Sequence, residues 1–129
     1  MVSTTLVDTQ IEDGERILRQ LDSDRFNVDS ALWLFDTQKE KWILLIATPL
    51  VNSVGPKKSY AKIKKSLDKL ATPLKTAALE VALIKPDHDL LRLLKSVVRV
   101  EPKIARMRFT GNVINGKLIE DALIYRLSS

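Results

Sequence analysis

The sequence predicts an α+β fold, in which a single mixed, mostly antiparallel five-stranded sheet packs against three helices in the chain order αββαβαββ. Three observations predict this fold. Apolar residues recur with helical spacing in three segments. Five other segments are rich in branched and aromatic residues and are typical of strands. No Pro-, Gly- or Ser-rich linker separates the segments, which favours one domain over residues 1–129.

The first element is a helix over residues 5–22, because its apolar residues form one stripe and its charged residues lie outside that stripe. Gly14 lies within the stripe, where a glycine costs about 1 kcal/mol relative to alanine. We therefore expect another backbone to approach closely at Gly14. Residues 28–36 and 41–48 follow as two strands, joined by a short polar connection that fits a hairpin.

Both of these strands are apolar on successive residues rather than on alternate ones. That pattern predicts cover on both faces and hence interior strands. Trp33 and Trp42 are accordingly expected in the core. The helix that follows begins near Pro56, which suits a first helical turn. Its inner face is predicted to consist of Tyr60, Ile63, Leu67 and Leu70.

A strand over residues 79–85, a helix over residues 88–99 capped by Asp87, and strands over residues 104–110 and 118–127 complete the order. Asn115-Gly116 predicts the tight turn of the last hairpin. Two registers are possible for this hairpin. Without a bulge, Arg108 faces Leu123. A bulge at Gly111 instead separates polar from apolar side chains, and we favour it because register follows the buried face.

Composition excludes several classes of protein. The chain of 129 residues has no cysteine, which excludes thiol nucleophiles, zinc ribbons, iron–sulfur clusters and disulfide scaffolds. It has one histidine, His88, which fits an exposed turn, and it lacks the Gly-rich dinucleotide motif, the nucleophile elbow and the zinc-protease motif. We expect no cofactor and no catalytic set. The longest apolar run, residues 42–47, is too short for a membrane span, and no secretory signal is present, so we expect a cytoplasmic protein.

The formal net charge of +5 conceals an asymmetry between the two halves of the chain. Residues 1–55 carry nine acidic and five basic side chains, whereas residues 56–129 carry seven acidic and sixteen basic ones. Two interpretations are open. The halves attract each other, within the fold or across a dimer, or the basic half faces a polyanion.

A polyanion site would use the lysines on the outer face of the helix over residues 57–69, together with arginines of the last two strands. The candidate residues are Lys57, Lys58, Lys62, Lys65, Lys69, Arg106, Arg108 and Arg126. The helix offers no arginine for bidentate base contacts and no outward aromatic ring for stacking. The pattern therefore argues against recognition of a sequence. It leaves two interpretations open, a generic attraction to a polyanion or a solvated face that serves only solubility.

We expect a non-enzymatic binding domain that self-associates as a homodimer, with exposed sheet edges at the strands over residues 118–127 and 79–85. The alternative is a protein that binds or processes nucleic acid. Two weaker candidates are a phosphate loop over residues 53–59 and a metal-dependent nuclease. The nuclease would combine the E-x-K motif at residues 101–103 with carboxylates near the first hairpin, namely Asp29, Asp36 and Glu40.

Overall fold

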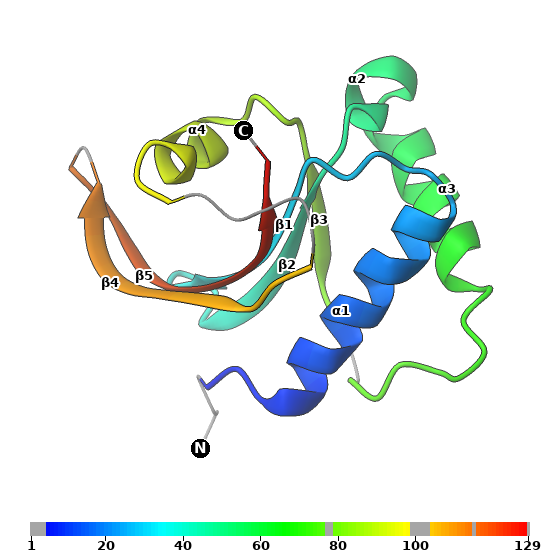
Figure 1. Cartoon of the computed structure of the whole chain (residues 1–129), viewed down its shortest axis with the longest axis horizontal. Coiled ribbons are helices and arrows are strands. Elements are labelled where there is room, and N and C mark those ends of the chain that lie inside the picture. Colours follow the sequence, from blue (N-terminus) through cyan, green and yellow to red (C-terminus); the bar gives the residue numbers. More distant parts are fainter. Residues whose placement is uncertain (1–4, 77–78, 99–103, 115, 129) are drawn as a thin grey trace.

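The computed structural model describes residues 5–76, 79–98, 104–114 and 116–128. In this part of the chain, four helices accompany one five-stranded sheet with the strand order β3-β2-β1-β5-β4 (Figure 1). The helices are α1 (Asp8–Ser23), α2 (Leu50–Val54), α3 (Pro56–Leu67) and α4 (Asp89–Lys95), and the strands are β1 (Ser30–Asp36), β2 (Lys41–Ala47), β3 (Val81–Ile84), β4 (Met107–Ile114) and β5 (Lys117–Leu127). Only β2 and β3 pair in parallel. The mixed, mostly antiparallel α+β fold is confirmed.

Helix α2 is the one described element that the sequence did not predict. It makes little more than one turn directly after β2, and it is too short to show an apolar stripe. Its start is fixed locally, because the Thr48 hydroxyl accepts a hydrogen bond from the Leu50 amide at 3.3 Å. Gly55 ends it with φ of 84°, and Pro56 then begins α3.

Helices cover both faces of the sheet, as the continuous apolar runs of β1 and β2 predicted. Helices α1 and α3 lie on one face and α4 on the other (Figure 1). The first face forms a core in which Ile17 and Leu21 pack with Trp33 and Trp42. The core on the other face joins residues of α4 to the sheet: Leu90, Leu91 and Leu94 with Leu32, Leu45 and Ile124.

At Gly14, helix α1 approaches the sheet closely. A Cβ atom at this position would lie 2.4 Å from the Tyr125 hydroxyl and 2.7 Å from Trp33 Nε1. The close approach is confirmed, although side chains rather than a backbone make it. Trp33 Nε1 donates to the Tyr125 hydroxyl at 2.9 Å, and that hydroxyl donates to the Ile11 carbonyl at 2.5 Å. The missing side chain therefore leaves room for a buried polar contact between helix and sheet.

The last hairpin takes the register that we did not favour. Arg108 pairs with Leu123, and no shift occurs along the β4–β5 ladder. Arg106 and Arg108 are accommodated on the face toward α1 because Glu15 and Asp121 give each a carboxylate partner. The irregularity at Gly111 is a positive φ of 58° rather than a change of register.

The two edges of the sheet are β3 and β4. The strand at residues 79–85 was expected at an edge and is confirmed there, over Val81–Ile84. The expectation for residues 118–127 was wrong, because β5 pairs with β1 on one side and with β4 on the other. Tyr125 and Ile124 of β5 are fully buried, so this strand belongs to the centre of the molecule.

Candidate binding surfaces

Helix α3 presents its lysines to solvent because its inner face is occupied by other residues. Ser59, Ile63 and Ser66 are buried, and the two hydroxyls have local partners: Ser59 donates to the Gly55 carbonyl and Ser66 to the Asp24 carboxylate. Tyr60, expected on this inner face, is instead 43% exposed. Its hydroxyl accepts a hydrogen bond from the Leu83 amide at 2.9 Å, so Tyr60 covers the outer side of β3.

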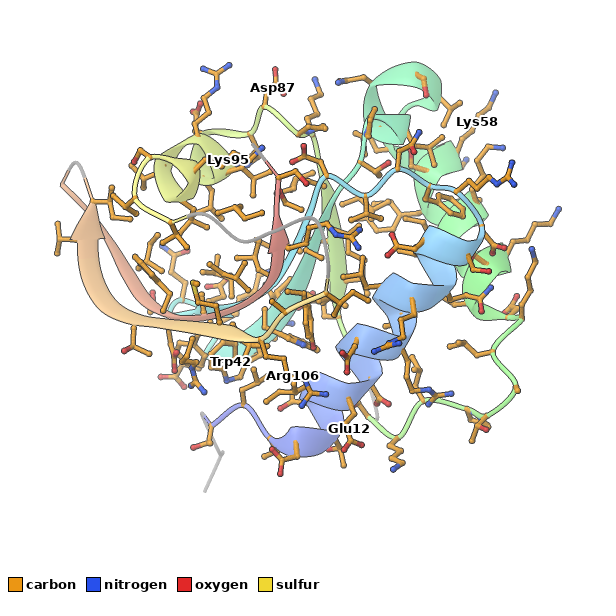
Figure 2. The ribbon with its side chains drawn as sticks, viewed as in Figure 1. Glu12, Trp42, Lys58, Asp87, Lys95 and Arg106 are labelled. Atoms are coloured by element: carbon orange, nitrogen blue, oxygen red, sulfur yellow. The ribbon has the colours of Figure 1, made fainter. Side chains whose placement is uncertain are left out.

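The lysine face, defined as Lys57, Lys58, Lys62, Lys64 and Lys65, is exposed over the whole of α3. Figure 2 shows Lys58 reaching away from the body of the molecule. Within the described part of the chain, none of these five ammonium groups forms an ion pair. Lys69, which follows the helix, differs because its Nζ lies 3.2 Å from Asp24 Oδ1. The stems of Lys58, Lys62 and Lys65 flank Ala61 and line a shallow hollow of about 270 Å³.

The strand arginines Arg106 and Arg108 lie away from α3 and are neutralised. Arg106 makes a 2.7 Å ion pair with Glu15 of α1, and this hydrogen bond lowers the pKa of the Glu15 carboxyl. Arg108 binds Asp121 with Nε at 2.7 Å and with a terminal nitrogen at 2.6 Å. Its guanidinium also lies 5.5 Å from the ring centroid of Trp42, a distance at which a cation attracts an aromatic face.

Arg126 belongs neither to the lysine face nor to the site of Arg106 and Arg108, and it is only 8% exposed. Its two terminal nitrogens bind both oxygens of Asp22, at 2.8 and 2.7 Å. It also borders a pocket of about 380 Å³ together with Arg25 and Asn27, two non-glycine residues with positive φ. The eight residues predicted for a polyanion site therefore fall into three groups, and only the α3 lysines combine exposure with free charge.

Ion pairs between the two halves of the chain account for much of the charge asymmetry. Five acidic residues of the first half bind basic residues of the second half: Glu12 with Lys75, Glu15 with Arg106, Asp22 with Arg126, Asp24 with Lys69 and Asp29 with Lys95. Attraction between the halves within the fold, one of the two open interpretations, is thus observed. The residues of the lysine face take no part in these ion pairs between the two halves.

Among the described residues, two of the carboxylates named for the nuclease candidate have structural partners. Asp36 accepts amide hydrogen bonds inside its own turn, and Asp29 binds Ser30 and Lys95. His88, not Asp87, caps α4 by accepting the Leu90 amide at 3.1 Å. The E-x-K motif at residues 101–103 lies outside the described residues. Among those described, no group of three His, Cys, Asp or Glu side chains is arranged to hold a metal ion.

The segment over residues 53–59, a weaker candidate for a phosphate loop, has a structural role. In a phosphate-binding loop the serine hydroxyl is turned toward the ligand or its metal ion. Here Ser59 is buried and its hydroxyl donates to Gly55, while Lys57 and Lys58 extend into solvent. The segment therefore ends α2 and begins α3 without forming a cradle for an anion.

The outer edge of β4 is a surface that the sequence analysis did not identify. β4 is the last strand of the sheet, and Figure 1 shows no described helix or strand beyond it. Val113 is 66% exposed and Met107 is 38% exposed. The segment Phe-Thr-Gly-Asn-Val-Ile, residues 109–114, contains no charged residue and no proline. A short neutral segment with strand propensity is the usual signature of a strand that pairs with another chain.

Comparison of the chain with protein-family models, with curated proteins and with solved structures gives no match. None of the helices in the described residues is long and apolar enough to cross a membrane. The lysine face of α3 and the outer edge of β4 are therefore the two candidate binding surfaces of the described chain.

Proposed function

We propose that this chain is a non-catalytic interaction domain that self-associates by pairing the outer edge of β4 with the same edge of a second copy. The observation that carries the proposal is the neutral edge over residues 109–114, which no described helix or strand covers and on which Val113 is exposed. We also assign the protein to the cytoplasm, because a chain without cysteine suits a reducing compartment.

An open edge is normally protected by charged side chains, by proline or by a covering element. Arg106 and Arg108 are the nearest charges before residue 109, and both are engaged by carboxylates of the same chain. They therefore do not repel a neighbouring strand strongly. Gly111 bends the edge, but β5 keeps one register with β4 on both sides of this bend. A further strand can follow the same curve.

A second copy is the partner that fits this edge. Two identical antiparallel strands related by a two-fold axis contact each other with the same surface, so that every contact occurs twice. Pairing would extend the sheet by backbone hydrogen bonds along the outer edge of β4 and would cover Val113. A stable interface of this kind should bury at least about 1,000 Å² in total.

The test is light scattering or sedimentation of the parent and of two matched variants. Val113→Lys places a charge on the edge and should raise the dimer dissociation constant at least tenfold. Val97→Lys is the control, because Val97 is 56% exposed and follows α4 rather than belonging to β4. The proposal is refuted if the parent has the mass of one chain and this mass does not change across a hundredfold dilution from high micromolar concentration. Equal weakening by both variants would place the interface elsewhere.

A further inference from the structure

The lysine face of α3 concentrates positive charge that the fold does not neutralise. From Pro56 to Leu67 the helix contains no acidic residue. Two carboxylates lie at or near the helix. Asp24 is bound by Ser66 and by Lys69, on the inner side and at the end of the helix, and Asp68 follows the last helical residue as its C-cap. An anion that approaches the middle of α3 from solvent therefore meets ammonium groups first.

The spacing of the lysines suits a regular row of negative charges. At ~1.5 Å per residue, Lys58, Lys62 and Lys65 cover about 10 Å along one side of the helix. One strand of duplex DNA carries a phosphate every ~3.4 Å along its axis, so this length faces about three phosphates. The lysine row thus matches the charge of a nucleic-acid backbone in both length and number.

The shape of the surface also favours the backbone over other anionic partners. Ala61 is the one small residue among the lysines that line the hollow, so a sugar–phosphate chain can lie close to the helix there. The apolar residue Ile63 is buried against the core, and no Trp or Phe lies in α3. A helix that inserts into a membrane surface needs an exposed apolar face, which α3 lacks.

We propose that α3 binds the phosphate backbone of duplex nucleic acid through Lys58, Lys62 and Lys65, without reading its sequence. Lys57 and Lys64 flank the row and add to its charge. Lysine contacts phosphate as a point charge, and α3 has no arginine for bidentate recognition of base edges. Arg106, Arg108 and Arg126 take no part, because Glu15, Asp121 and Asp22 engage them.

The experiment measures binding to two short DNA duplexes of unrelated sequence by fluorescence anisotropy over a range of salt concentrations. Each phosphate contact contributes about 0.9 to the slope of log K against log salt. Three contacts predict a slope of about −2.7, hence an affinity about 40-fold weaker at about 200 mM than at about 50 mM salt. The two duplexes should bind equally.

Two triple variants separate the lysine face from net charge. Lys58, Lys62 and Lys65 are changed to Gln in one variant, and Lys39, Lys85 and Arg92 are changed to Gln in the other. All six side chains are exposed and both variants lose three charges, so the net charge is the same in each. Glutamine is a good helix former, and circular dichroism checks that α3 is retained. The first variant should lose most of the slope and the second should keep most of it.

Three outcomes would overturn the proposal: no binding by the parent at low salt, equal loss in both variants, or binding to vesicles of anionic lipid but not to duplex DNA. The result does not depend on the dimer. Light scattering on the same samples reports self-association separately, so failure of the lysine face and failure of the β4 edge give different patterns.

Discussion

The two edges of the sheet are built differently, although both belong to one layer. β3 has four residues, pairs in parallel with β2 and is approached by α3, whose Tyr60 hydroxyl binds the Leu83 amide. Lys41 and Glu80 add an ion pair at 3.0 Å beside it. β4 has eight residues, pairs antiparallel with β5 and presents Val113 to solvent.

The difference follows from how each strand is connected. A parallel pair requires a crossover connection, usually helical, that packs back on the sheet. The crossover between β2 and β3 contains α2 and α3, so the connection itself supplies the cover for β3. A hairpin needs only a tight turn, and β4 therefore reaches the edge of the sheet with no described helix or strand packed beyond it. The connection, rather than the strand sequence, decides which edge remains open.

The largest loss of stability is expected at Gly14, where α1 packs against the middle strands of the sheet. Gly14→Leu should destabilise the protein by more than about 3 kcal/mol, above the usual range for an overpacked core. The new Cβ alone would overlap Tyr125 and Trp33, which must move apart and lose their hydrogen bond. Thermal unfolding measures the effect. Thr9→Leu, on the exposed side of α1, is the control, and a Gly14 variant that melts with the parent would contradict the packing.

Most of the fold was predictable because it depends on local patterns. The apolar stripe of α1, the continuous apolar runs of β1 and β2 and the turn signal at Gly116 each act within a few residues. The errors in strand register and strand order concern choices made over long distances. The register of β4 depends on Glu15, which lies in α1, and the interior position of β5 depends on its pairing with β1. No local pattern contains this information.

The second prediction concerns the connection that leads to the covered edge. Asp13 of α1 is fully buried and accepts hydrogen bonds from the Lys75 amide at 3.2 Å and the Thr76 amide at 2.5 Å, shortly before β3. Burial raises the pKa of Asp13, but hydrogen bonds from Thr76 and Lys75, together with Arg16, outweigh it and lower the pKa overall. Asp13→Asn should cost about 1.5–3 kcal/mol, the value of a hydrogen bond to a charged group.

The sign of the pH effect follows from this lowered pKa. The charged carboxylate stabilises the folded state above the unfolded pKa of about 3.9, and that contribution is lost as the pH falls through the folded value. The stability difference between the parent and Asp13→Asn should therefore be largest near neutral pH and shrink below about pH 4. Denaturant titrations at several pH values measure it. A difference independent of pH would mean that Asp13 is not charged in the fold.

The candidate surfaces were predictable only in part. The lysine face followed from helical spacing, because exposure on a helix is a local property, and the structure places these lysines in solvent. The grouping of Arg106, Arg108 and Arg126 with them did not hold, since each arginine has a carboxylate partner supplied by tertiary structure or by a neighbouring strand. Net charge in the sequence therefore overstates the free charge on the surface. The open edge of β4 required the strand order, which the pattern of residues did not contain.

The smallest loss of stability is expected from a variant of Tyr60, the residue that covers β3. Tyr60→Phe removes one hydroxyl and leaves the ring in place, so it should cost about 0.5–1.5 kcal/mol, the net value of one hydrogen bond. The Leu83 amide then lacks its partner while the ring still shields it. Hydrogen exchange at Leu83 should become faster, whereas self-association through β4 should not change. An exchange rate equal to that of the parent would show that the hydroxyl does not protect this edge, and stronger self-association of the variant would show that β3, and not only β4, is available to a second copy.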